Sequence, residues 1–168
     1  MARAKKLSTV LTEEEQERLL EQPKPRYPTG ERNGTMLRLM LNTGLRLAEV
    51  TSLKWHDVDL TTGKLMVRQG KGAKDRTLWV AEGDIDRLRS WRERQAAACD
   101  TCGYAFTTLQ WQPLGHHYVQ RMVKRYAVKA GIAPMLTNGV IGLCSGLSCT
   151  SKQLAILVLR RPPCLFLP

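Results

Sequence analysis

Hydrophobic residues recur at the period of an α-helix in several stretches of the chain. A capping box of Thr12 and Glu15 opens the first stretch, which predicts a helix from Thr12 to Glu21. The same period predicts further helices over Thr35–Thr43, Leu47–Leu53, Glu82–Ala98 and His116–Ala130. Prolines and glycines interrupt the pattern between Gln22 and Gly34, so we expect a loop there.

Two short stretches alternate instead between apolar and polar residues, as half-buried strands do. The expected strands are Lys64–Gln69 and Asp75–Val80, joined by the glycine-containing loop Gly70–Lys74. Trp55–Leu60 and Tyr104–Thr108 are also expected to be extended. The pattern as a whole predicts an α+β fold that is mostly helical and carries a small antiparallel β-sheet with a hairpin.

The pattern changes near residue 134. All 15 acidic residues lie at or before Asp100, and residues 135–168 show no sustained helical or strand period. An apolar segment without amphipathic spacing cannot bury one face and solvate the other. We therefore divide the chain into a basic arm (1–10), a domain (11–134) and an aberrant apolar tail (135–168). We interpret the tail as a foreign ending, left by a frameshift or a truncation.

The charge of the chain points to a polyanionic partner. There are 26 Lys and Arg residues against 15 Asp and Glu, a formal net charge of +11. Nucleic acid is the commonest partner of such a chain, and a merely solvated basic surface is the alternative. The longest apolar run, Leu154–Leu159, is far shorter than the roughly 20 residues of a membrane-spanning helix. The N-terminus has no apolar signal core, so we expect a cytoplasmic protein without membrane contact.

The five cysteines are an odd number, which argues against a closed disulfide framework. Cys99 and Cys102 form a CxxC motif, and a zinc site requires further ligands. The available ones fit no common spacing: they are His116, His117, Cys144 and Cys149. The sequence therefore favours a solvated pair of thiols over a metal site, and we expect neither a metal nor another cofactor.

Arg46 stands where one predicted helix has ended and the next begins. Gly44 is suited to a left-handed cap on the first helix. A guanidinium at a helix start, beside free backbone N–H groups, can grip two oxygens of one phosphate. Glu49, one turn later, is placed to orient Arg46. The alternative is an exposed arginine with an ordinary i,i+3 partner, and this motif alone does not decide between the two.

Basic residues crowd the expected hairpin. The segment from Arg68 to Arg76 contains one acid, Asp75, and four basic residues: Arg68, Lys71, Lys74 and Arg76. Glycines on both sides of Lys71 allow the backbone to approach a DNA strand. A lysine in that position can donate a proton to an oxygen leaving phosphorus. The alternative is a solvated hairpin tip; the GxxxxGK[ST] pattern of nucleotide-binding loops does not occur.

Four segments follow one another in a distinctive order and spacing: Leu11–Glu15, Leu39–Val50, Leu53–Asp59 and Gly70–Arg76. Together they resemble the start of the catalytic domain of tyrosine recombinases, the phage integrase family. Later stretches are also similar to that family: Phe106–Thr108, Pro113–Leu114 and Val123–Ile132. The resemblance covers about residues 11–134, and the ordered combination is specific although each segment alone is not.

The resemblance implies a recombinase-type catalytic fold and site-specific DNA recombination or integration. In that family a tyrosine attacks a DNA phosphodiester and forms a phosphotyrosine link, while two arginines and a histidine stabilise the transition state without a metal. By resemblance, Arg46 is the first arginine, Glu49 its supporting acid, and Lys71 the general acid. Arg68, Lys74 and Arg76 are the expected DNA-binding residues.

The second half of the family pattern is missing. After Ile132 the family continues into further histidines, a second arginine and the tyrosine, whereas no histidine or tyrosine follows Tyr126 here. Tyr118 and Tyr126 precede the missing motif, so we interpret them as structural and leave the nucleophile unknown. His116 and His117 also come too early, and we interpret them as surface residues. The N-terminal DNA-clamping domain usual in the family is not expected either.

We therefore expect a truncated or degenerate, inactive copy of a recombinase that binds double-stranded DNA, with homo-oligomers forming on the DNA. One alternative is a non-catalytic DNA-binding remnant. The other is an unrelated basic RNA-binding module, which predicts no convergence of Arg46 and Lys71.

Overall fold

The computed structural model describes residues 11–68, 75–99 and 102–132. The predicted basic arm, the hairpin lysines Lys71 and Lys74, and the predicted tail lie outside the described residues. The elements in chain order are α1 (Glu13–Leu20), α2 (Pro28–Thr43), α3 (Leu47–Ser52), the 3-10 turn η1 (Trp55–Asp57), β1 (Lys64–Val67), β2 (Arg76–Trp79), α4 (Glu82–Ala96) and α5 (His116–Lys129). This mostly helical arrangement with one antiparallel sheet confirms the predicted α+β class.

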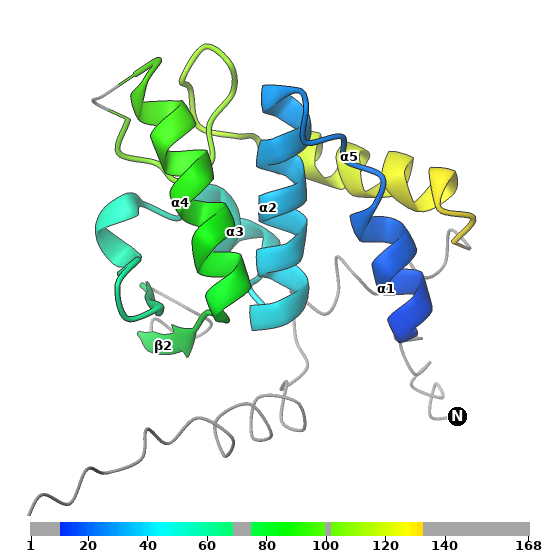
Figure 1. The fold of residues 1–168 in the computed structure, drawn as a ribbon, viewed down its shortest axis with the longest axis horizontal. Helices are drawn as coiled ribbons and strands as arrows, with labels where there is room; N and C mark the ends of the chain where they lie inside the picture. The colour runs from blue at the N-terminus through cyan, green and yellow to red at the C-terminus, as the bar shows by residue number, and fades with distance from the viewer. Residues whose placement is uncertain (1–10, 69–74, 100–101, 133–168) are drawn as a thin grey trace, which may run out of the picture.

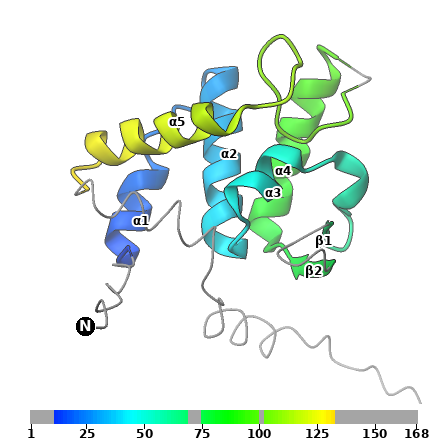
Figure 2. The same ribbon diagram turned by 180° about the vertical axis from the view of Figure 1, so that it is seen from behind.

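Helix α2 lies in the middle of the described helices, with α4 on one side and α1 on the other (Figure 1). Seen from behind, α5 crosses the upper part of α2 and reaches α1, while α3 and the strands lie below and to the side (Figure 2). The core between these elements is mainly aliphatic, as the low aromatic content of the sequence predicts. Met36 and Leu37 of α2 and Leu88 of α4 are among its fully buried residues.

Helix α2 begins well before the predicted start at Thr35, so the loop predicted from Gln22 to Gly34 is wrong over its second half. Pro28 occupies the first turn of the helix, where a missing N–H costs nothing. Gly30 is required by close packing, because a Cβ atom there would lie 1.9 Å from the carbonyl oxygen of Lys24. The residues that suggested a loop therefore have other roles: Pro28 begins the helix, and Gly30 allows it to pack closely against Lys24.

The hairpin strands pair as predicted but are shorter. β1 and β2 are antiparallel, with Leu65 opposite Leu78 and Val67 opposite Arg76. The stretch predicted to be extended from Trp55 to Leu60 instead starts with the 3-10 turn η1. Single bridges on either side, Lys54 with Tyr104 and Val58 with Leu65, join this stretch to the rest of the domain.

Candidate phosphate-binding site

Arg46 lies at the junction of α2 and α3, where a glycine allows the chain to turn. Gly44 adopts φ 68°, in the left-handed region, and its N–H donates to the carbonyl of Met40 at 3.0 Å. The backbone N–H of Arg46 donates to Glu49 Oε2 at 2.8 Å, and Arg46 Nη1 donates to Glu49 Oε1 at 2.9 Å. Glu49 therefore binds both the backbone and the side chain of Arg46, and it occupies the N–H that we had expected to be available to a phosphate.

A second arginine reaches the same carboxylate from the hairpin. Arg76 Nη1 donates to Glu49 Oε1 and Arg76 Nη2 donates to Glu49 Oε2, both at 2.7 Å. This is the bidentate geometry in which a guanidinium binds a carboxylate most strongly. One glutamate thus brings together two arginines from separate elements, a pairing that the sequence did not predict.

The carboxylate is covered while the two arginines remain accessible. The side chain of Glu49 is 8% exposed, against 29% for Arg46 and 32% for Arg76. Burial by itself raises the pKa of Glu49, but hydrogen bonds from Arg76 and from the backbone and side chain of Arg46 outweigh it, and the net pKa is lowered. Glu49 therefore stays ionised, and two cations on one anion leave a net positive charge at the surface.

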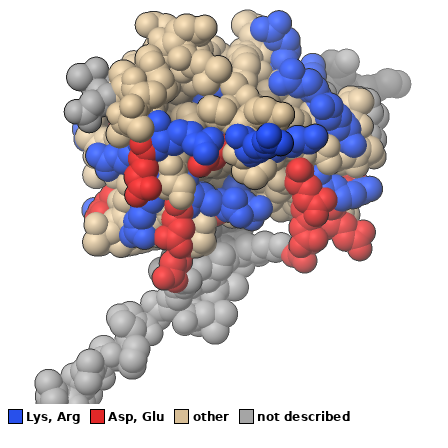
Figure 3. All heavy atoms as spheres, turned by 45° about the horizontal axis from the view of Figure 1, so that its top comes forward, with Lys and Arg blue, Asp and Glu red and all other residues tan. Residues whose placement is uncertain are grey.

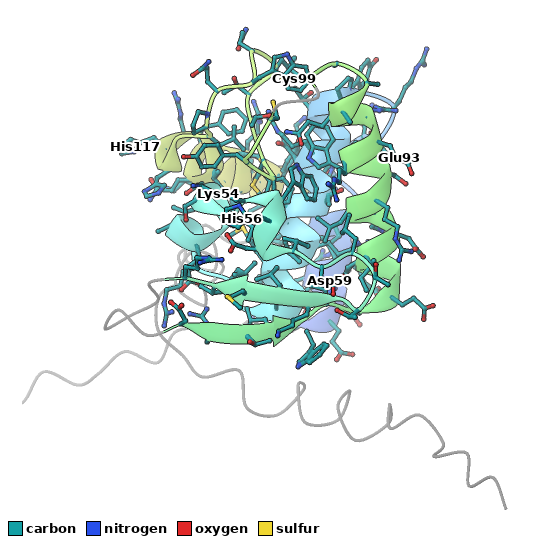
Figure 4. The ribbon with its side chains drawn as sticks, turned by 90° about the vertical axis from the view of Figure 1, so that its left-hand side faces the viewer. Lys54, His56, Asp59, Glu93, Cys99 and His117 are labelled. Carbon is teal, nitrogen blue, oxygen red and sulfur yellow. The ribbon has the colours of Figure 1, made fainter. Side chains whose placement is uncertain are left out.

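Arg68, another predicted DNA-binding residue, is held by a different acid. Its Nε donates to Asp57 Oδ1 at 2.5 Å, and His56 Nε2 lies 3.4 Å from the same oxygen. The side chain of Arg68 is 57% exposed, so it remains accessible from solvent. Figure 4 shows Lys54 and His56 on this same segment between α3 and the hairpin. The base of the hairpin thus carries cations that are anchored by carboxylates.

The position of Lys71 stays a prediction. Arg76 pairs with Val67 at the base of the hairpin, and Lys71 and Lys74 belong to the loop beyond it, outside the described residues. The contact of Arg76 with Glu49 places the base of that loop beside Arg46.

A buried polar cluster in α2 and α5 was missed from the sequence. Arg32 is 2% exposed and donates to the carbonyl of Thr107 at 2.7 Å, to Asn33 Oδ1 and to the hydroxyl of Tyr118. Asn33 Nδ2 donates to the hydroxyl of Tyr126 at 3.1 Å. Burial lowers the pKa of Arg32, although the two tyrosines oppose this effect. A polar Arg-Asn pair before an apolar helical run was the available signal, but our predicted loop obscured it.

This cluster accounts for both tyrosines of α5. Their hydroxyls are engaged by Arg32 and Asn33, in agreement with their interpretation as structural residues. His116 and His117 are exposed, as predicted, and Figure 4 shows His117 pointing outward.

Positive charge is spread over the surface. In Figure 3, Lys and Arg side chains form a broken band across one face, with Asp and Glu gathered at its lower edge. Net charge alone therefore does not locate a nucleic-acid site, and the carboxylate-anchored arginines are the more specific feature. Among the described residues, no cluster of three or more His, Cys, Asp or Glu could hold a metal ion, and no helix is long and apolar enough to cross a membrane.

Comparison with protein families finds that residues 9–139 match the phage integrase family. Among curated relatives, tyrosine recombinase XerC of Xanthomonas axonopodis pv. citri (strain 306) is 36% identical over 128 residues, which are 76% of this chain and 41% of the relative. Tyrosine recombinase XerA of Thermococcus kodakarensis is 34% identical over 126 residues, covering 75% of this chain and 44% of the relative. The chain spans less than half the length of each of these two relatives.

Solved structures share the fold. The crystal structure of XerA recombinase has a TM-score of 0.67 at 21% identity, covering 96% of this chain and 67% of that chain. XerH recombinase bound to palindromic difH substrate, a post-cleavage complex, has a TM-score of 0.66 at 23% identity, covering 83% of this chain and 42% of that chain. A lambda integrase dimer bound to a COC' core site has a TM-score of 0.61 at 17% identity, with 89% and 48% covered.

Proposed function

We propose, from the premise that the chain belongs to the phage integrase family, that it carries the phosphate-binding half of a recombinase active site. The complete reaction would be DNA strand cleavage and rejoining through a phosphotyrosine link. The observation that carries the proposal is the pairing of Arg46 and Arg76 on the buried carboxylate of Glu49.

This arrangement suits a DNA phosphate for two reasons. The Nε and Nη2 side of the Arg46 guanidinium matches phosphate oxygens, and Glu49 fixes the orientation of both arginines before DNA arrives. The Nε and Nη2 groups of Arg46 make no hydrogen bond to the described protein, so they remain to bind an anion. Lys71, in the loop beyond Arg76, would protonate the leaving oxygen, while Arg68 and Lys74 would bind neighbouring phosphates.

The remaining catalytic groups do not have counterparts in this sequence. No histidine or tyrosine follows Tyr126, and the hydroxyls of Tyr118 and Tyr126 already bind Arg32 and Asn33. We therefore propose that the chain binds duplex DNA but does not cleave it. The DNA-bound recombinase structures, one of them a dimer, support duplex DNA as the partner and association of copies on it. The family match does not favour the unrelated RNA-binding module.

Salt-dependent DNA binding tests this proposal. When the logarithm of the affinity of the full chain for duplex DNA is plotted against the logarithm of the salt concentration, it should fall on a straight line. The slope of that line should be roughly −0.9 for each phosphate neutralised. Arg46→Ala should make this slope shallower by about one such step, and the triple substitution of Lys71, Lys74 and Arg76 by Ala should flatten it further.

Arg18→Ala is the matched control, because it removes the same charge from an exposed position on α1, on the opposite side of α2 from the hairpin (Figure 1). Its slope should equal that of the unmodified chain. Equal slopes for Arg18→Ala, Arg46→Ala and the triple variant would refute a phosphate site at this place.

A further inference from the structure

The two cysteines of the CxxC motif lie in contact after the end of α4. Cys102 Sγ donates to Cys99 Sγ across 2.9 Å, and both residues are thiols with partly exposed side chains. A disulfide bond is about 2.05 Å long, so the sulfur atoms need to approach by only about 0.9 Å. Figure 4 shows Cys99 at the edge of the domain, where a small oxidant has access.

Gln95 holds the segment that carries this pair from both ends, through its backbone carbonyl and its side chain. The N–H of Cys99 donates to the carbonyl of Gln95 at 2.8 Å, which fixes the first cysteine to the end of α4. Gln95 Nε2 in turn donates to the carbonyl of Tyr104 at 3.3 Å, two residues after the second cysteine.

Trp55 completes this frame. Its Nε1 donates to Gln95 Oε1 at 2.6 Å, and its N–H donates to the carbonyl of Gly103 at 3.0 Å. Gln95 is 2% exposed, so solvent does not compete with these hydrogen bonds. These hydrogen bonds bring the two thiols together without a bond between them.

A metal is a poor explanation for the pair. A structural zinc site needs four ligands, and the described residues contain no third His, Cys, Asp or Glu that would complete even a three-ligand group. Two adjacent thiols without further ligands are suited to dithiol–disulfide chemistry instead.

We propose that Cys99 and Cys102 form a reversible intrachain disulfide, a modification site separate from the phosphate-binding arginines. The oxidant is a small-molecule disulfide. The thiolate of Cys99 attacks one of its sulfurs, so that a mixed disulfide forms and one small thiolate leaves. Cys102 then loses its proton to solvent and attacks the sulfur of Cys99, and the second small thiolate leaves. Two protein thiols are oxidised and one small disulfide is reduced to two thiols.

The order of these steps follows from the hydrogen bond between the sulfurs. Burial, together with the hydrogen bond to Cys99, raises the pKa of Cys102 to about 11. Cys102 therefore keeps its proton at neutral pH, and its hydrogen bond to Cys99 would stabilise a thiolate formed there. Cys99 is the attacking residue and Cys102 the resolving residue.

Trypsin makes the test direct, because residues 95–121 form one tryptic peptide that contains these two cysteines and none of the other three. The full chain is equilibrated with oxidised and reduced glutathione at several ratios, quenched in acid, alkylated and digested. The mass of the peptide is then measured by mass spectrometry. Under excess oxidised glutathione the peptide should lose two hydrogen atoms and take up no alkylating agent. Under excess reduced glutathione it should take up two. Cys144→Ser, outside the peptide, should behave identically.

The single variants identify the two roles. In Cys99→Ser the remaining Cys102 should react slowly with glutathione, and in Cys102→Ser the mixed disulfide on Cys99 should form readily and persist. The proposal is overturned if the peptide of the unmodified chain keeps both thiols under oxidising conditions, carries glutathione on both, or becomes linked to Cys144, Cys149 or Cys164.

Discussion

At the proposed phosphate site, Glu49 lets two arginines lie close together. Several cations must lie close together before the anion arrives, although they repel one another. Each oxygen of Glu49 accepts a hydrogen bond from Arg76, and Oε1 also accepts one from the Arg46 guanidinium. The carboxylate thus offsets the repulsion, and its burial keeps water from competing for the same donors.

Replacing Glu49 by Gln should destabilise the domain at neutral pH by about 1–3 kcal/mol, because two arginines lose their charged acceptor. The folded-state pKa of Glu49 lies below the unfolded value of about 4.3, so the contribution of the carboxylate is present above that value and is lost as pH falls through the folded pKa. The difference in the free energy of unfolding between the two proteins should therefore shrink below about pH 4. Urea unfolding at several pH values measures it.

Glu17→Gln provides the comparison for that series, since Glu17 is an exposed residue of α1. It should change the free energy of unfolding little at any pH, as most surface substitutions do. A difference for Glu49→Gln that stays constant from neutral to acid pH would contradict the role assigned to the carboxylate.

Local spacing revealed one of the two contacts of Glu49. The pair Arg46 and Glu49 is three residues apart across a helix start, so the sequence predicts it. The contact with Arg76 requires the hairpin to fold back against α3, and no local rule supplies that. The same holds for Arg32, whose partners Thr107 and Tyr118 come from distant parts of the chain.

At the scale of elements, periodicity located helices well where their apolar faces are regular. The helix predicted from Glu82 to Ala98 is observed from Glu82 to Ala96, and that from His116 to Ala130 is observed to Lys129. The start of α2 was missed because its first turns contain proline and glycines, which usually break helices. Here Pro28 lies in the first turn, where it is tolerated, and Gly30 allows close packing against Lys24.

Two glycine-to-alanine substitutions test this account of α2. Gly30→Ala should destabilise the domain by more than about 1 kcal/mol, because the added methyl group meets the backbone carbonyl of Lys24 and one segment must move. Gly83→Ala, in the first turn of α4, meets nothing within 4 Å and should leave stability unchanged or raise it by up to about 1 kcal/mol. Thermal unfolding of the two variants separates the effects. Equal shifts in Tm would show that Gly30 is not needed for this close approach.

At the scale of the whole molecule, the match to the phage integrase family covers residues 9–139. The match to the phage integrase family ends at residue 139, and the described helices and hairpin supply Arg46, Glu49 and Arg76. The sequence predicted the family because its motifs are local and follow one another in order, while the boundary near residue 134 stays a prediction. It did not predict the convergence of the two arginines on one carboxylate, which depends on how α2, α3 and the hairpin pack.

Because recombinase active-site residues act as a unit, the incomplete set should leave almost no rate rather than a proportionate share. The proposed site would hold a phosphate through Arg46 and Arg76, but breaking the diester also requires a nucleophile and groups that stabilise the transition state. We expect no covalent protein–DNA adduct when an excess of the full chain is incubated with nicked duplexes of randomised sequence and examined on a denaturing gel. The XerA relative from Thermococcus kodakarensis serves as the comparison protein on the same duplexes. An adduct of this chain that disappears in Tyr118→Phe or Tyr126→Phe would contradict the prediction. It would mean that a tyrosine now bound to Arg32 or Asn33 leaves that cluster to attack DNA.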